Sequence, residues 1–284
     1  MGLGKASPPI ATSMLKLDET IAWGELRFGL PQEADDWMTC SDLIDSSERL
    51  AEWRNEAAEM FVELQDCDVE EIAPAVPAAH VLGWYCDTFA WIGSALFHSA
   101  RRVPDIAPDS VAFRRHPVEG WIDGIALLNG SFLCLPDDPS VDHPDATAVP
   151  DVETLAASLR SRVVDHAQQF LGRYEPDVRL GWHSLWGAVT DSFDSGAWTA
   201  GSMLGDAAAG ARDSRMLLPG NSWPFTSGSS TYEVLDARGR RWWSRRRETC
   251  CFAYRLPKPS VCFTCPRIDD AERATRADKW PDPF

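Results

Sequence analysis

The sequence predicts an α+β fold that is mainly helical, with a small antiparallel sheet and a C-terminal cysteine loop. Three observations predict it: long segments whose apolar residues recur every three or four positions, short β-prone runs between them, and four cysteines crowded near the end of the chain. The 284 residues, 44% hydrophobic and 25% charged, suit one large domain or two small ones. We expect an N-terminal helical region (1–75), a central helical and β region (76–237) and a C-terminal segment (238–284) that forms one compact unit with the central region.

The first half of the chain contains two clear helical patterns. Residues 1–20, which include Pro8-Pro9, resemble a loose arm. Ser46 can cap an amphipathic helix that extends to Leu64. A second helix, from Pro77 to about Arg102, is apolar on most faces and should lie buried at the centre of the fold.

The second half begins with β-prone runs and returns to helix. Asn129-Gly130 lies between two such runs and predicts a β-hairpin. The polar stretch 136–150 indicates a loop, and Asp151 can cap a helix to about Tyr174. A further helix begins near residue 178 and can continue through 196–211, and residues 232–243 suggest a hairpin that leads into the cysteines.

Charge is distributed unevenly along the chain. The net charge is −16, but residues 1–237 carry −22 and residues 238–284 carry +6. So acidic a chain is a poor candidate for nonspecific nucleic-acid binding. No signal-peptide pattern and no run of eighteen apolar residues occurs. We therefore expect a cytoplasmic protein without a membrane span, whose thiols stay reduced and are available as metal ligands.

Half of the eight cysteines form one motif: Cys250, Cys251, Cys262 and Cys265, an adjacent pair, ten intervening residues, and then C-x-x-C. Four thiols on so short a loop can surround a zinc ion or an iron–sulfur cluster. Structural zinc sites usually pair two short knuckles, and only the second pair has that spacing. The adjacent pair therefore favours a two-iron cluster, which offers two attachment points. All six histidines lie upstream, so no His-containing site is indicated.

A run of basic and aromatic residues precedes the motif. We expect it to attract an anionic substrate or an acidic electron donor and to favour the reduced form of a cluster, although each arginine could equally be a solvated charge. The residues in this candidate binding set are Arg240, Arg241, Arg245, Arg246, Arg247 and Trp243.

The motif resembles that of the FhuF-like family of siderophore-iron (ferric iron) reductases. The resemblance rests on Cys-Cys-x10-Cys-x2-Cys in the setting Arg-Arg-Glu-Thr-Cys250-Cys251-Phe-Ala-Tyr-Arg-Leu-Pro, and on Leu185-Trp186-Gly187 upstream. It is tight over 240–267, diffuse over 80–240 and absent over 1–75. Where the family often has Asn after that glycine, this chain has Ala188. The family implies a [2Fe–2S] cluster held by Cys250, Cys251, Cys262 and Cys265.

The resemblance also implies a function: one-electron reduction of siderophore-bound Fe(III) to Fe(II), with residues 76–237 shaping the substrate site. No glycine-rich dinucleotide fingerprint is present. A separate ferredoxin or flavin or NAD(P)H reductase should therefore supply electrons, and transient proximity to a membrane transporter would fit the role. Two alternatives remain: a structural zinc-binding interaction module and a cluster-based redox sensor.

Overall fold

The computed structural model describes residues 7–176, 178–235 and 238–277. The α-helices are α1 (Pro9–Asp18), α2 (Cys40–Ile44), α3 (Ser47–Gln65), α4 (Ala75–Cys86), α5 (Ile92–Ala100), α6 (Val152–Leu171), α7 (Trp182–Met203), α8 (Ala207–Leu217) and α9 (Asp270–Ala277). The short helices are η1 (Val69–Glu71), η2 (Asp87–Trp91, a turn of π-helix) and η3 (Ala253–Arg255). The strands are β1 (Glu25–Phe28), β2 (Trp37–Thr39), β3 (Arg102–Pro104), β4 (Val111–Arg115), β5 (Ile122–Leu127), β6 (Phe132–Cys134), β7 (Ala146–Ala148), β8 (Thr231–Leu235) and β9 (Arg241–Arg245).

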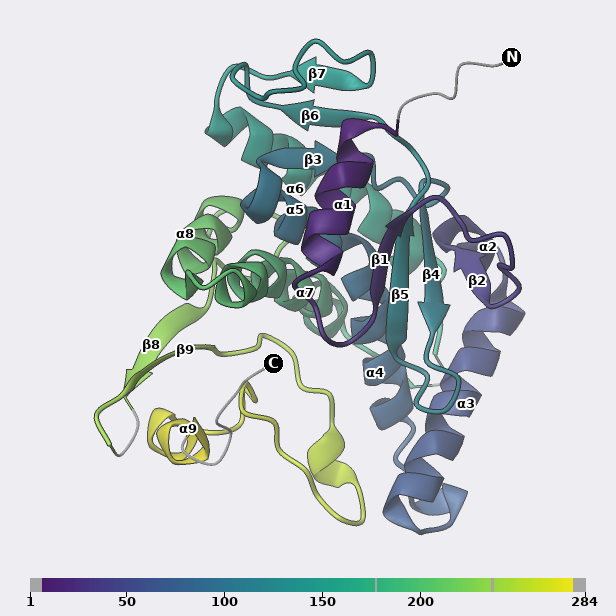
Figure 1. Ribbon diagram of the computed structural model, residues 1–284. Coiled ribbons are helices and arrows are strands. Elements are labelled where there is room, and N and C mark those ends of the chain that lie inside the picture. The colour runs from purple at the N-terminus through teal and green to yellow at the C-terminus, as the bar shows by residue number, and fades with distance from the viewer. Residues whose placement is uncertain (1–6, 177, 236–237, 278–284) are drawn as a thin grey trace.

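The fold is α+β, as expected, with helices predominating. A four-stranded sheet in the order β1-β5-β4-β2 lies beside the central helix, which consists of α4, η2 and α5, and α7 and α8 lie on the other side of that helix (Figure 1). A second sheet has the order β3-β6-β7, and β8 and β9 form a separate hairpin. The two larger sheets are mixed rather than antiparallel, because β1 runs parallel to β5 and β6 parallel to β7.

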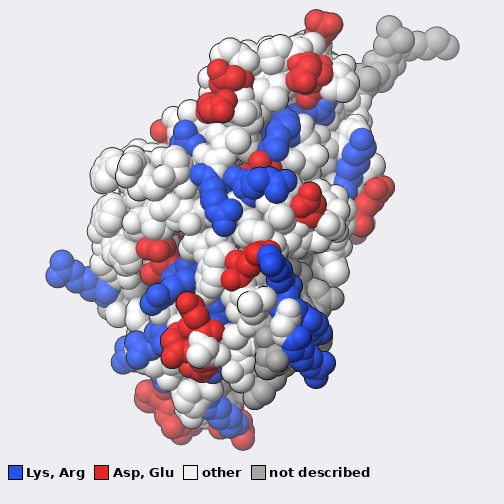
Figure 2. Space-filling view, turned by 90° about the vertical axis from the view of Figure 1, so that its left-hand side faces the viewer, with Lys and Arg blue, Asp and Glu red and all other residues white. Residues whose placement is uncertain are grey.

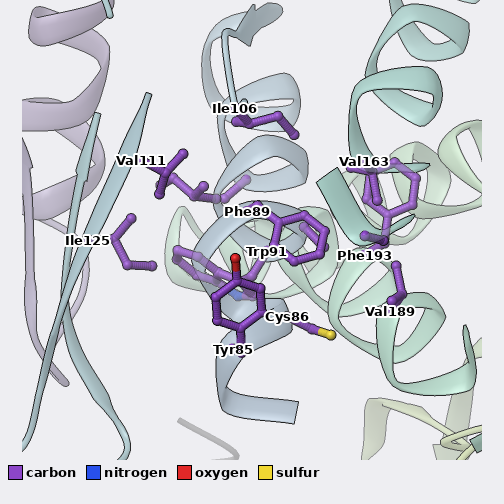
Figure 3. Packing of buried hydrophobic residues seen from close by; sticks show 14 of the residues in the cluster. Tyr85, Cys86, Phe89, Trp91, Ile106, Val111, Ile125, Val163, Val189 and Phe193 are labelled. Atoms are coloured by element: carbon purple, nitrogen blue, oxygen red, sulfur yellow. The ribbon is translucent and has the colours of Figure 1, made fainter. Parts of the chain in front are cut away.

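The central helix is the middle layer of the hydrophobic core. Figure 3 shows Phe89 and Trp91 of this helix between Ile125 of the sheet and Phe193 of α7. One buried cluster extends along the chain from Ile10 to Phe225. The N-terminal region therefore contributes to the same core as the central region.

The predicted helix caps are present. The Ser46 hydroxyl accepts from Arg49 N at 3.2 Å, and the Asp151 carboxylate accepts from Thr154 N at 2.7 Å. The predicted central helix is present but begins at Ala75, and the π-helical turn η2 interrupts it between α4 and α5. It ends where Arg101 takes a left-handed conformation.

Two predictions for local structure are wrong. The loose arm contains α1, which turns Ile10, Met14 and Leu17 into the core because they share one face. The Asn129-Gly130 turn does not join a hairpin, because β5 and β6 belong to different sheets. Asn129 instead donates to Asp105 Oδ2 at 2.7 Å, so the turn directs the chain from one sheet to the other.

The predicted hairpin, in which Tyr232 pairs with Ser244, leads into the C-terminal segment. Beyond Arg245 the chain has little regular structure until α9. Within the described ranges, no helix combines the length and apolar character that crossing a bilayer requires.

Candidate metal centre and adjoining cavity

The four predicted ligands lie on the irregular loop between β9 and α9. The loop is attached to the body of the protein at its far end, where buried Leu256 packs with Phe61 and Val76. The backbone N of Lys258 also donates to Gln65 Oε1 at 2.8 Å. These contacts hold the cysteine loop against the ends of α3 and α4.

The loop turns sharply directly after the adjacent cysteine pair. Phe252 has a φ of 60°, a left-handed conformation that costs a bulky residue about 1–2 kcal/mol. The turn brings backbone donors toward sulfur, and Phe252 N lies 3.4 Å from Cys250 Sγ. Arg267 N lies at the same distance from Cys265 Sγ. N–H···S bonds of this kind tune thiolate ligands of iron–sulfur clusters.

The cysteines of the two halves of the motif affect one another's pKa. A hydrogen bond with the Cys262 thiol, aided by Arg247 and the Ala253 N–H, lowers the pKa of Cys251 to about 6 against the effect of burial. The same hydrogen bond and burial raise the pKa of Cys262. Burial raises the pKa of Cys250, and the charge of Cys265 adds to that rise. Cys251 is thus stabilised as a thiolate, the form that binds metals.

All eight cysteines are free thiols. Among the described residues, no three Cys, His, Asp or Glu side chains approach closely enough to hold a single metal ion. The candidate donor set is four soft thiols, two from each half of the motif, and each iron of a [2Fe–2S] cluster takes two sulfur ligands from the protein. Four thiols are therefore the donor set that a two-iron group would need.

A cavity of about 700 Å³ adjoins the cysteine loop. Cys251 and Cys262 both line it, while Cys250 and Cys265 do not. Indole rings form much of its wall, namely those of Trp23, Trp84, Trp91, Trp121, Trp198 and Trp243. The volume is typical of small-molecule sites. A ligand in this cavity would lie beside two of the four thiols.

Asp191 fixes the chain that leads into the cysteine pair. This residue of α7 is only 4% exposed, and its carboxylate accepts from Glu248 N at 2.8 Å and from Thr249 N at 3.0 Å. The Thr249 hydroxyl donates to it at 2.8 Å. Arg245 and Arg247 pair with the same carboxylate at 3.3 and 3.5 Å. One buried acid therefore sets the position of residues 245–249.

Gly187 explains the Leu-Trp-Gly segment of α7 in physical terms. A Cβ atom at this position would collide with Thr249 Cγ2 and would also contact Glu248 Cβ. Glycine at this position lets residues 248 and 249 approach α7 without that collision and reach Asp191, one helical turn further along.

The predicted basic set is divided between the cavity and the surface. Arg245, Arg247 and Trp243 line the cavity, and the Arg215 guanidinium lies over the Trp243 ring at 5.6 Å. Arg246 is exposed and donates to Pro266 O at 3.2 Å.

Arg240 and Arg241 are also exposed, at the tip of the hairpin, where Arg241 pairs with Glu233 at 3.1 Å. On the face shown in Figure 2, Lys and Arg side chains lie among Asp and Glu side chains. The structure therefore does not bring the six predicted residues together in one site.

Sequence reasoning missed three residues of the site: Asp87, Asp191 and Arg273. Arg273 of α9 is fully buried and donates to Cys265 O at 3.0 Å and Ile268 O at 3.2 Å, which holds the C-x-x-C turn. Nothing local distinguishes these residues, although Asp191 follows the Leu-Trp-Gly segment by four positions.

No family model, curated protein or solved structure matches this chain.

Proposed function

We propose that this chain is a cytoplasmic ferric siderophore reductase whose Cys250, Cys251, Cys262 and Cys265 hold a [2Fe–2S] cluster. The observation that carries the proposal is the shared wall: Cys251 and Cys262 line the same cavity that would receive the substrate. Bound there, such a cluster would supply single electrons. The resemblance of the motif to the FhuF-like family supports the same assignment.

The residues around the cavity have separable roles in this proposal. The indole walls give an apolar surface against the organic part of a chelate and displace water from it. The Cys251 and Cys262 thiols both raise the pKa of Arg247, and its positive charge would offset the negative charge of their thiolates. Hydroxamate and catecholate oxygens bind Fe(III) far better than Fe(II), so one electron is enough to loosen the iron.

The electron donor should be a separate protein, a ferredoxin or a flavin or NAD(P)H reductase. Among the described residues that line the cavity, no glycine-rich turn is available for a dinucleotide pyrophosphate. Exposed cations on the cysteine loop, among them Arg255, Lys258 and Arg267, would attract an acidic donor.

Anaerobic purification tests the cofactor. We expect a red-brown protein with iron and acid-labile sulfide in equal amounts, and an EPR signal after dithionite reduction. Cys251→Ser and Cys262→Ser should lose the colour, whereas Cys134→Ala, at a buried core thiol outside the motif, should keep it. A colourless protein that contains stoichiometric zinc would instead establish the zinc-module alternative.

Turnover tests the activity. The dithionite-reduced protein should release Fe(II) from ferric siderophores, detected with a ferrous chelator, faster than dithionite alone. An iron–sulfur protein that fails to accelerate release from any ferric hydroxamate or catecholate would refute the reductase and favour the redox sensor.

A further inference from the structure

Asp87 is the carboxylic acid of the cavity wall that the fold does not use as an anchor. It is the first residue of the π-helical turn η2, which interrupts the central helix between α4 and α5. Single turns of π-helix within α-helices are rare, and many of them lie at functional sites. The turn places the half-buried Asp87 side chain on the wall of the cavity that Cys251 and Cys262 also line.

The other buried acids nearby have structural partners. Asp191 holds the two backbone N–H groups of Glu248 and Thr249. Asp194 does not line the cavity and accepts from Ser230 N at 3.0 Å and Ser230 Oγ at 2.9 Å. Within the described residues, the Ser192 hydroxyl is the hydrogen-bond partner that lowers the pKa of Asp87, and no backbone N–H does so.

The charged and titratable groups around Asp87 come from four parts of the chain. The ionisable side chains that line the cavity are His80 of α4, Asp191 of α7, Arg245 of β9, and Arg247, Cys251 and Cys262 of the loop. The described residues of α5, α6, β4 and β5 contribute no charged side chain to this wall. His80 stays neutral near pH 7, because burial lowers its pKa.

Burial raises the pKa of Asp87 to about 6, with Asp191 adding to the rise and Ser192, Arg245 and Arg247 opposing it. A carboxyl group with such a pKa is protonated in part near neutrality and can deliver a proton inside the cavity. Proton delivery is the second requirement of iron release, because a free hydroxamate or catecholate oxygen would otherwise bind the iron again.

We propose that Asp87 is the general acid that protonates the siderophore oxygen as its iron is released. This inference rests on the proposed function. In the balanced step, one electron from an external one-electron donor reduces Fe(III) to Fe(II), and the Fe–O bond breaks. The Asp87 carboxyl proton passes to the departing oxygen to give a neutral hydroxamic acid or phenol. Solvent then reprotonates the carboxylate.

Single-turnover kinetics test the proposal. Dithionite-reduced wild type, Asp87→Asn and Asp87→Glu are mixed with a ferric trihydroxamate, and Fe(II) release is followed from pH 5 to 8. The wild-type rate should fall as pH rises above about 6, because the acid form is lost. Asp87→Asn should release iron about 10²-fold more slowly and without that dependence, and Asp87→Glu should restore the pH-dependent limb.

A redox-inert probe separates proton delivery from binding. The Ga(III) complex of the same trihydroxamate should quench tryptophan fluorescence equally in wild type and Asp87→Asn. Loss of Ga(III)-complex binding in Asp87→Asn would overturn the assignment by making Asp87 a binding residue. Fe(II) release by wild type, with the same rate and pH profile in Asp87→Asn, would overturn it and leave the reductase standing. Failure of wild type itself to release Fe(II) would remove the proposed function and this inference with it.

Discussion

Replacing Asp191 by Asn should destabilise the protein severely, although the two side chains have the same shape. The carboxylate receives three hydrogen bonds from Glu248 and Thr249 and pairs with Arg245 and Arg247. A carboxamide has one oxygen, and its NH₂ group would face a backbone N–H. Removing one partner of a buried charge pair costs about 3–5 kcal/mol. We therefore expect Asp191→Asn to lower the unfolding free energy by about that amount.

The assay is urea denaturation under anaerobic conditions, followed by circular dichroism and tryptophan fluorescence. Asp151→Asn is the matched control, since Asp151 caps α6 at the surface and Asn caps a helix equally well. That control should behave as wild type. If Asp191→Asn retained wild-type stability, the buried carboxylate would not be the anchor of residues 245–249, and the account of the loop would be wrong.

Three further predictions follow from other contacts. Gly187→Ala should lower the unfolding free energy, measured by urea denaturation, by about 1–3 kcal/mol, because the new Cβ meets Thr249. The control Gly83→Ala should not lower it, because no atom lies near that Cβ position. Equal effects of the two substitutions would refute the close approach at Gly187. Hydrogen bonds from Arg102, at 2.8 and 2.7 Å, lower the pKa of Asp138 below its usual 3.8. A carboxyl group whose pKa is lower in the folded than in the unfolded state stabilises the fold at pH values above its unfolded-state pKa. The difference in unfolding free energy between wild type and Asp138→Asn should therefore shrink as pH falls from 6 to 3, and a constant difference would contradict this prediction. Finally, Arg246→Glu should slow reduction by an acidic electron donor mainly at low salt, because Arg246 is exposed and such charges are screened; salt-independent kinetics would show that the donor does not contact it.

Much of the helical layer could be predicted from the sequence, because local signals determine it. Ser46 and Asp151 are caps that act over three residues, and the apolar central helix needs no distant partner to be recognised. The predictions failed where a distant partner decides the outcome. Asn129-Gly130 has the composition of a hairpin turn, but Asp105 binds the Asn129 side chain and the flanking strands pair elsewhere.

The site divides in the same way. The cysteine spacing is local, so the four candidate ligands could be named from the sequence alone. The cavity could not, because its wall combines Trp23, Asp87 and Asp191 with Cys262, residues drawn from most of the chain. A carboxylate on an apolar helix carries no mark of the loop that it will hold.

The arginine run shows how tertiary structure changes the meaning of a charge pattern. In sequence, Arg245, Arg246 and Arg247 are equivalent cations. In the fold, alternation along the strand end sends Arg245 and Arg247 inward to Asp191 and leaves Arg246 outside. Of the three, Arg246 is therefore the one placed to serve as a docking charge. The two inward guanidiniums are already matched in part by Asp191, so the cavity is far less positive than the run suggests. A reversal of all three charges would therefore first break the Asp191 anchor, and its kinetic effect could not be assigned to substrate or donor binding. Single substitutions at Arg246 and Asp191 separate the two roles.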